Sequence, residues 1–384
     1  MQGTELLMRA LGLALGNRQW LLSEDIESAL DSAIVIAKKQ EVSGLLFEGL
    51  SRAELALPPE VQSTLLLRAA AELRHVETQC RSFATLAGAF EERGIDYIPL
   101  KGAALRPLYP RPELRVGRDV DVLVRPSDLE RAVECALSAL KAKTVFRSDH
   151  DVSLVSADGV HFELHFSLLE KGFGKESVLA RPWEVARSQG SHCYQLPDDV
   201  QLCYLFSHIA KHLRHGGCGV RPLLDVYLFS ACHPESLESA FSLLAPMCLD
   251  EFARTLLSDA RTFFTQGEWS EEQRRLCAFF LSNGSFGTFR SHAALREAQG
   301  KRKAPTRFFF SRALPPYSHM VVLFPILRKL PVLLPFCWVI RGTRLLRRKD
   351  RARFFAIQAE NSAATSEEAM EMQRTLAYLK LPIP

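Results

Sequence analysis

The most informative acidic residues lie in a short segment of alternating side chains, residues 119–124. Asp119 and Asp121 are separated by one residue, and the other positions are valine or leucine. Because side chains of an extended strand alternate between its faces, both carboxylates should share one face while valines enter a core. Two ionised carboxylates this close repel each other, and a cation between them relieves that repulsion. Since Mg²⁺ prefers oxygen ligands and substrate phosphates, the pair predicts a magnesium site.

A second segment, residues 160–166, has the same alternation. His161, Glu163 and His165 fall on one face of the expected strand, and apolar residues at 162, 164 and 166 fall on the other. If this strand lies beside the first, Glu163 joins the aspartates as third metal ligand, and such a group can hold a triphosphate and activate an attacking hydroxyl. The alternatives are a solvated acidic strand face and a Zn²⁺ site at the two histidines and Glu163.

Cationic residues and a glycine precede the aspartates. Lys101 and Gly102 stand before an expected short helix, where backbone N–H groups favour phosphate and glycine permits close approach. Arg115 could contact phosphate, whereas Arg118 is more typical of a surface residue. We therefore expect Lys101, Gly102, Arg115 and His165 to bind nucleotide, with a plain strand-to-helix turn as the alternative for Lys101-Gly102.

Three histidines share one face of a helix further along the chain. His208, His212 and His215 are spaced four and three residues apart, with Lys211 beside them. We expect His208, Lys211 and His212 to line the nucleotide cleft and Asp225 to orient one of the histidines. One alternative is a zinc site that includes a nearby cysteine. The other is that these histidines are simply hydrogen-bonded on the helix face and bind no ligand.

The elements that must position these residues form a small mixed sheet between helical regions, so the predicted fold class is α+β. Strands are expected at 95–100, 119–124, 151–156 and 160–166, and a last helix at 365–379. Four regions follow from the pattern: a helical region 1–94, an α/β core 95–196, a helical region 197–300 that closes the cleft, and a basic, proline-punctuated region 301–384.

The composition is that of an ordinary globular protein. Of 384 residues, 47% are hydrophobic and 24% charged, and the net charge of +4 does not by itself indicate nucleic acid or membrane. The nine cysteines are scattered without a CxxC pair, which argues against a disulfide framework and a zinc ribbon. The start has no signal-peptide pattern, and the longest apolar runs fall short of a bilayer span. We therefore expect a cytoplasmic protein.

The C-terminal region carries most of the basic surplus, since residues 341–353 contain seven Lys/Arg and one acid. Prolines prevent one continuous helix in residues 320–353. We predict that this segment packs on the body of the protein. The residues expected to be mostly buried are Leu323, Phe324, Leu333, Leu334 and Phe336. The alternative is contact with an anionic membrane or RNA through 338–353.

The segments LKGAALRPLYP, RVGRDVDVLV and HFELHF together resemble the uncharacterised nucleotidyltransferase family within the polymerase-β-type superfamily. That superfamily has a glycine turn, then Asp-x-Asp on a strand, then a third carboxylate. These features fall on Gly102, on Asp119 and Asp121, and on Glu163. Ala103 departs from the pattern, because many members have a serine there. The resemblance spans most of the chain, but only 98–124 and 160–166 are motif-specific.

The resemblance implies an enzyme that uses Mg²⁺ or Mn²⁺. An acceptor hydroxyl on a small molecule, a protein or RNA would attack the α-phosphate of a nucleoside triphosphate such as ATP and release pyrophosphate. Asp119, Asp121 and Glu163 would be the catalytic and metal-binding residues, and replacing either aspartate by asparagine should abolish transfer and raise the melting temperature without metal. The rival is a non-catalytic nucleotide-binding scaffold docked at a membrane or partner through the basic C-terminal segment.

Overall fold

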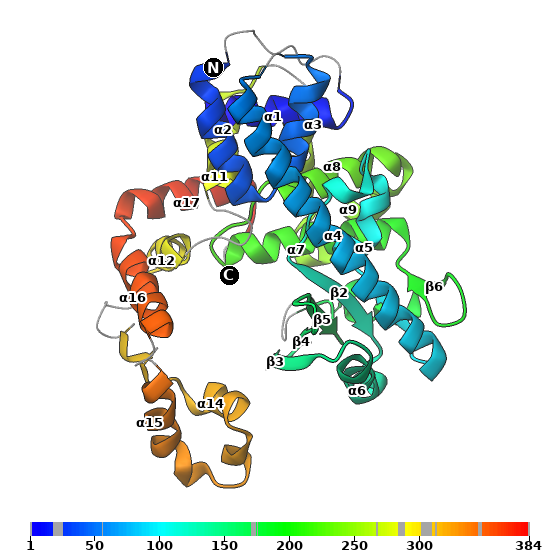
Figure 1. Ribbon diagram of the computed structural model, residues 1–384, viewed down its shortest axis with the longest axis vertical. Helices are drawn as coiled ribbons and strands as arrows, with labels where there is room; N and C mark the ends of the chain where they lie inside the picture. The colour runs from blue at the N-terminus through cyan, green and yellow to red at the C-terminus, as the bar shows by residue number, and fades with distance from the viewer. Residues whose placement is uncertain are drawn as a thin grey trace. The chain divides into compact units, whose positions relative to one another are not determined.

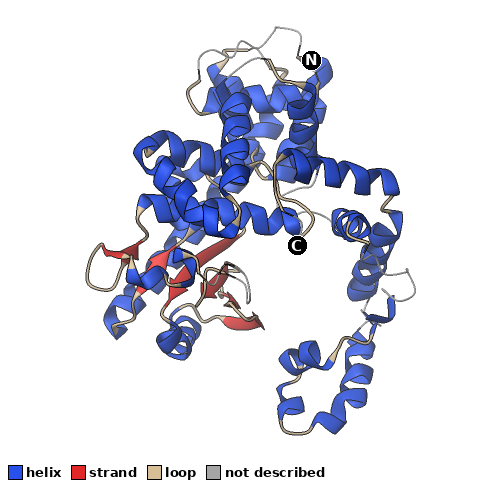
Figure 2. Cartoon of the chain, turned by 180° about the vertical axis from the view of Figure 1, so that it is seen from behind, coloured by secondary structure: helices blue, strands red, loops and turns tan. Residues whose placement is uncertain are grey.

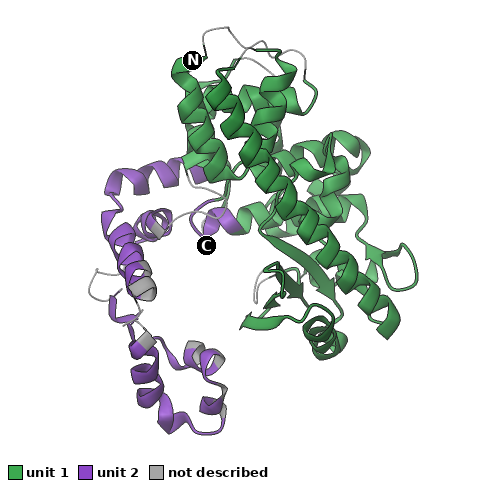
Figure 3. Ribbon diagram, viewed as in Figure 1, with its two compact units in different colours: residues 1–211, 218–285, 378–382 green, residues 212–217, 286–377, 383–384 purple. Residues whose placement is uncertain are grey.

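The structure is a computed structural model, and it forms two compact units, shown in different colours in Figure 3. The first unit comprises residues 1–211, 218–285 and 378–382, and the second comprises residues 212–217, 286–377 and 383–384. The residues that the structure describes are 2–17, 26–55, 57–169, 174, 176–265, 268–282, 289–300, 309–311, 313–344 and 348–382. The four-region division of the sequence stays a prediction.

The N-terminal part of the first unit is helical, as expected. It consists of α1 (Gly3–Ala14), α2 (Glu27–Gln40), α3 (Ser43–Arg52) and the long α4 (Pro59–Arg93). Proline begins α4, and Gly94 ends it in the left-handed conformation with φ of +63°. α1 and α3 approach closely because Gly49 has no side chain: a Cβ there would lie 1.9 Å from the carbonyl oxygen of Ala10.

The rest of the first unit adds further helices, some near the sheet and others, such as α11, against the N-terminal helices (Figure 1). These are α5 (Lys101–Leu105), α6 (Leu129–Ala139), most of α7 (Asp198–Arg214), α8 (Arg221–Cys232), α9 (Leu237–Leu244), α10 (Asp250–Thr265) and α11 (Glu271–Ser282). One buried polar side chain joins distant segments: Gln40 donates to the carbonyls of Phe280 and Leu281 and accepts from the N–H of Val220. All polar atoms of that amide are thereby satisfied in the core.

The sheet has five strands in the order β1-β2-β5-β4-β3 (strands red in Figure 2). They are β1 (Tyr97–Pro99), β2 (Asp119–Val124), β3 (Lys143–Arg147), β4 (Asp151–Val155) and β5 (His161–His165). β2 and β5 are parallel, and all other neighbours are antiparallel. A separate small hairpin joins β6 (Arg187–Ser188) to β7 (Tyr194–Gln195). The expected mixed sheet between helical regions is confirmed.

One face of the sheet forms the hydrophobic core with α4 and α6. The valines of β2 and the apolar residues Phe162 and Leu164 of β5 are almost completely buried there, together with Phe90 of α4 and Ala136 of α6. Alternation along the strand then places the acidic side chains on the opposite face. In β2 and β5 the apolar residues therefore lie in the core, and the carboxylates point away from it.

The second unit contains α12 (Phe289–Ala298), α14 (Tyr317–Leu323), α15 (Leu334–Arg344), α16 (Arg348–Ala363) and most of α17 (Ser366–Tyr378). The last helix agrees with the expected 365–379. Ala293 and Ala294 of α12 pack with Ala364, and a separate small cluster gathers α14 and α15 around Met320, Leu327 and Cys337.

The expected burial of the C-terminal apolar residues is wrong for Leu323 and Phe336, which are 38% and 67% exposed. Phe324, Leu333 and Leu334 are half-buried. Prolines divide this segment into short helical pieces, and each piece shares only a narrow side with the small cluster. Part of the basic segment 338–353, residues 345–347, lies outside the described residues. None of the described helices is both long and apolar enough to span a lipid bilayer.

Candidate active site

The parallel pairing of β2 and β5 sets the position of the acidic residues. In the register of the two strands, Asp121 lies opposite Glu163, and Asp119 lies opposite His161. Asp121 is buried, whereas Asp119 and Glu163 are half-buried. The structure thus brings the three predicted carboxylates to one face of neighbouring strands, where one ligand could contact all of them.

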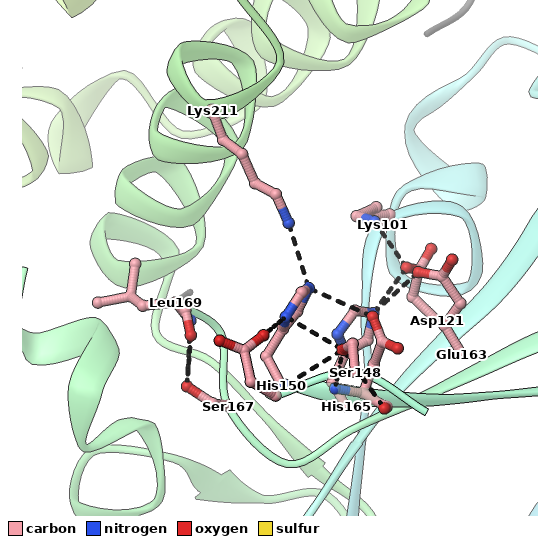
Figure 4. Close-up of polar contacts among 11 residues, drawn as sticks. Lys101, Asp121, Ser148, His150, Glu163, His165, Ser167, Leu169 and Lys211 are labelled. Atoms are coloured by element: carbon pink, nitrogen blue, oxygen red, sulfur yellow. Dashed lines mark hydrogen bonds and ion pairs between the residues drawn. The ribbon is translucent and has the colours of Figure 1, made fainter. Parts of the chain in front are cut away.

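Lys101 provides the nearest cation to this group. Its Nζ donates to Oδ1 of Asp121 at 2.6 Å, and only 15% of its side chain is exposed (Figure 4). The residue begins α5 with φ of +39°, a conformation that side chains rarely adopt and that persists where surrounding contacts enforce it. The ammonium of Lys101 balances the negative charge of Asp121. A metal ion bound at this carboxylate would balance the same charge.

His165 contacts the same aspartate. Its Nε2 lies 3.0 Å from Oδ1 of Asp121 and 3.4 Å from Oε2 of Glu163, and the ring is buried. Ligand atoms of these three residues all lie within 4.8 Å of one another, which makes them one of two groups among the described residues that could hold a metal ion. Asp119 is not in that group, and its predicted part in metal binding stays a prediction.

The charges of the site shift several pKa values. Burial and then the charge of Asp121 raise the pKa of Asp119 to about 6. Burial alone would raise the pKa of Asp121 as well, but the ammonium of Lys101 and the hydrogen bond from His165 hold it well below its usual range. Against the effect of burial, Asp121 raises the pKa of Lys101 well above its ordinary value. Lys101 and Asp121 therefore form a fully charged pair at neutral pH.

The loop before β2 is held by helices on both sides. Nε2 of His75 lies 2.9 Å from the carbonyl oxygen of Gly117, and the amide of Gln79 donates to the same oxygen at 2.9 Å. Arg221 donates to the carbonyl of Val116. α4 and α8 thus fix the backbone immediately before Asp119.

Arg115 was expected to contact phosphate, and the structure places it in a buried ion pair. Its Nη2 and Nε donate to the two oxygens of Asp225 at 2.7 and 3.2 Å. The hydroxyl of Tyr109 donates to the same carboxylate at 2.8 Å. Asp225 therefore orients Arg115 rather than a histidine. A contact between Arg115 and phosphate stays a prediction. Arg118 lies at the surface beside Glu41.

His150 is a polar residue of the site that the sequence did not indicate. It lies in the loop between β3 and β4, with Nε2 3.2 Å from Oδ2 of Asp151 and Nδ1 2.9 Å from Oδ1 of Asp149. Its ring stacks on that of His165, with centroids 6.1 Å apart. Lys211 of α7 points at it, with Nζ 3.3 Å from Nε2 (Figure 4). In the sequence His150 stands between Asp149 and Asp151, directly before the predicted strand 151–156. The strand on its other side, β3, was not predicted.

The remaining predicted nucleotide ligands lie along α7. Tyr204, which sequence reasoning missed, is buried on this helix close enough to interact electrostatically with Lys101 and Asp121, and burial raises its pKa. The ring of His208 lies 6.0 Å from that of Tyr204. His212 belongs to the second compact unit. The predicted roles of His208, Lys211 and His212 in nucleotide binding stay predictions.

Gly102 matters for packing as well as for its expected contact with phosphate. A Cβ at this position would lie 2.7 Å from Nη1 of Arg115, which Asp225 holds in place. Gly102→Ala should therefore displace Arg115 and destabilise the protein by about 1–3 kcal/mol, measured by urea unfolding. Gly88→Ala is the matched control, because a Cβ there meets nothing within 4 Å on α4. It should stabilise by about 0.5–1 kcal/mol, and equal effects at both positions would contradict this account of Gly102.

Comparisons with known proteins complete the description of the site. A family model described as "Uncharacterised nucleotidyltransferase" matches residues 27–264, well over half of the chain and all of the sheet. No individual curated protein matches the sequence. One solved structure, of the antibiotic-resistance factor ANT(2'')-Ia, is 13% identical and is matched over 44% of this chain and 92% of that chain, with a TM-score of 0.35. At that TM-score the likeness supports no conclusion.

Proposed function

Because this chain belongs to the uncharacterised nucleotidyltransferase family and is an enzyme of that class, we propose that it transfers a nucleoside monophosphate from a nucleoside triphosphate to an acceptor hydroxyl. The observation that carries the proposal is the register of β2 and β5, with Asp121 opposite Glu163 and Asp119 one step along the same face. Small molecules, proteins and RNA all offer such hydroxyls, and ATP is the nucleotide to test first.

The proposed reaction forms one bond and breaks one. The acceptor oxygen bonds to the α-phosphorus, and the bond from that phosphorus to the oxygen bridging to the β-phosphate breaks. Pyrophosphate leaves with the electron pair. Glu163, half-buried beside Asp121, accepts the proton of the attacking hydroxyl.

The residues on this face fit a Mg²⁺ or Mn²⁺ ion held by Asp119, Asp121 and Glu163. Carboxylate oxygens are the ligands that these ions prefer, and the buried Asp121 is already paired with a cation. A bound ion would supply positive charge to the phosphates. His165 acts as a positioning residue: its Nε2 donates to Asp121 and fixes the orientation of that carboxylate.

Lys101 and Lys211 are side chains of the protein that bring positive charge to this site. Lys101 pairs with Asp121, and its ammonium would contact the phosphates of a nucleotide bound on this face. Lys211, on α7, contacts His150 at the edge of the same site. We assign phosphate contacts also to the backbone of Gly102 and to Arg115. His208 and His212 are assigned to the nucleotide cleft.

We place the activity in the cytoplasm. All nine cysteines are free thiols, including Cys135, Cys203 and Cys277 in the core. Free thiols in this number are typical of a reducing compartment.

A label-transfer experiment tests the proposed function. The purified protein is incubated with each α-labelled triphosphate, Mg²⁺ and cell extract, and both the labelled species and released pyrophosphate are measured. Wild-type protein should label an acceptor. Glu163→Gln should not, while the matched control Asp158→Asn, an exposed turn residue between β4 and β5, should behave as wild type. Absence of both label and pyrophosphate with every triphosphate would refute the proposal.

A further inference from the structure

The outward face of α15 is apolar. Phe336, Val339 and Ile340 are 67%, 67% and 51% exposed. Their spacing of three and four residues places them in one stripe along the helix. Cys337 of the same helix is buried in the small cluster with Met320 and Leu327, and Leu334 and Trp338 pack against that cluster. The helix therefore packs part of its apolar surface in the cluster and presents Phe336, Val339 and Ile340 to solvent.

The segment that leads into α15 continues this pattern. Ile326, Leu330 and Val332 are 51%, 49% and 75% exposed. The fold around them is nonetheless ordered by specific bonds: the hydroxyl of Tyr317 donates to the carbonyl of Leu327 at 2.7 Å, and the indole of Trp338 donates to the carbonyl of Pro315 at 2.8 Å. Exposed apolar side chains gathered on an ordered scaffold mark an interaction surface.

The sequence that contains this surface is strongly basic. Residues 298–349 contain twelve Lys/Arg and no Asp or Glu. Among the described residues, Lys329 is exposed next to Leu330, and Arg341 donates to the carbonyl of Ala313 one turn beyond Cys337. The partner of this surface must therefore accept apolar side chains and carry negative charge.

These two requirements distinguish the candidate partners. RNA offers phosphates, but the stripe is mostly aliphatic and provides few aromatic rings for base stacking. A second copy of the same surface would bring like charges together. An anionic lipid surface satisfies both requirements, because acyl chains accept the apolar side chains and headgroups accept Lys and Arg. We propose that α15 and the segment 323–333 dock the protein on an anionic phospholipid bilayer.

The dimensions fit a helix that lies along the surface. α15 has 11 residues, which corresponds to a length of roughly 16 Å, about half of a hydrocarbon core. Phe336 and Val339 would enter the boundary between headgroups and acyl chains. Lys329 would meet the headgroups at the end where the helix begins.

Vesicle flotation with the full chain tests the docking surface. One set of vesicles is phosphatidylcholine alone, and the other contains phosphatidylcholine and phosphatidylglycerol in equal parts. Wild-type protein should float with the anionic vesicles only, and high salt should release it. The double variant Phe336→Ser/Val339→Ser should reduce the bound fraction about tenfold or more, because two apolar side chains no longer leave water.

A matched control is available on α4, where Leu66 and Leu67 are 54% and 70% exposed. Leu66→Ser/Leu67→Ser should float as wild type does. Circular dichroism should give equal melting curves for both variants. Nucleotidyl transfer should be unchanged in both, so the result is independent of the proposed function. No flotation with anionic vesicles, equal flotation of all proteins, or a change of oligomeric state in the α15 variant would overturn the proposal.

Discussion

Asp121→Asn is expected to abolish nucleotidyl transfer and also to destabilise the protein. Transfer should fall on the order of a thousandfold or more, because the amide cannot supply the negative charge that a metal ion needs. Stability should fall by about 3–5 kcal/mol, because Lys101 would stay buried without its partner. That pair has an Nζ–Oδ1 distance of 2.6 Å, and the Asp121 side chain is 2% exposed.

Asp119→Asn should lose transfer to a similar extent but gain stability without metal. Burial and the charge of Asp121 raise the pKa of Asp119 to about 6. The ionised carboxylate therefore destabilises the folded state above that pH, and the neutral amide removes the effect, by about 1–2 kcal/mol. The stability gained by Asp119→Asn relative to the wild type should become smaller as the pH falls through 6. The expectation from sequence, that either replacement raises the melting temperature, is thus revised for Asp121.

Urea unfolding with a chelator present and label transfer with Mg²⁺ separate the two effects. Equal stability changes in both variants would contradict the role of Lys101 as partner of Asp121. Near-wild-type transfer by either variant would show that the aspartates are not the metal platform. Asp158→Asn, on the exposed turn between β4 and β5, is the control for charge removal alone.

The pair of Arg115 and Asp225 should give the largest loss of stability outside the carboxylate group. Arg115→Met removes the guanidinium that donates to both oxygens of Asp225 and leaves the hydrogen bond from Tyr109 in place. Asp225→Leu leaves the buried guanidinium without its carboxylate. Each single variant should lose about 3–5 kcal/mol. The double variant should lose much less than the sum, because apolar side chains of similar size replace the whole pair.

A double-mutant cycle in urea measures this coupling. The two residues are 110 positions apart in the sequence and join the loop before β2 to α8. If the stability loss of the double variant equals the sum of the two single losses, the ion pair contributes little and the variants act through packing. Glu238→Gln is a suitable reference, since its pair with Arg254 is exposed and should contribute little to stability.

The alternation of side chains in strands was sufficient to predict the carboxylate face. A period of two places Asp119 and Asp121 on one side of β2 and Glu163 on the corresponding side of β5, whatever the surrounding helices do. The core followed from the same rule, because the residues between them are valine, leucine and phenylalanine. The family pattern added the chemistry expected of this face.

Contacts that depend on backbone conformation or on distant segments could not be predicted in the same way. The bond from Lys101 to Asp121 joins residues 20 positions apart, and Lys101 has a positive φ that no pattern in the sequence specifies. β3 could not be predicted from an alternation of apolar and polar residues, because four of its five residues are exposed and none has to enter the core. Apolar runs in the C-terminal region predicted burial, yet Leu323 and Phe336 are exposed, since short helices separated by prolines have too few neighbours to cover them.

The single parallel pairing in the sheet has a consequence for how the protein folds. β1, α5 and β2 are close in sequence and bring Lys101 to Asp121, while β3, β4 and β5 form local hairpins that bring His150 near His165. Local pairings of this kind form early, and parallel pairing across a long excursion forms late. We therefore expect two preformed halves that meet at the β2–β5 seam in the last step. Transient opening of that seam would divide the carboxylate face in two, and ligands that contact both strands would hold it closed.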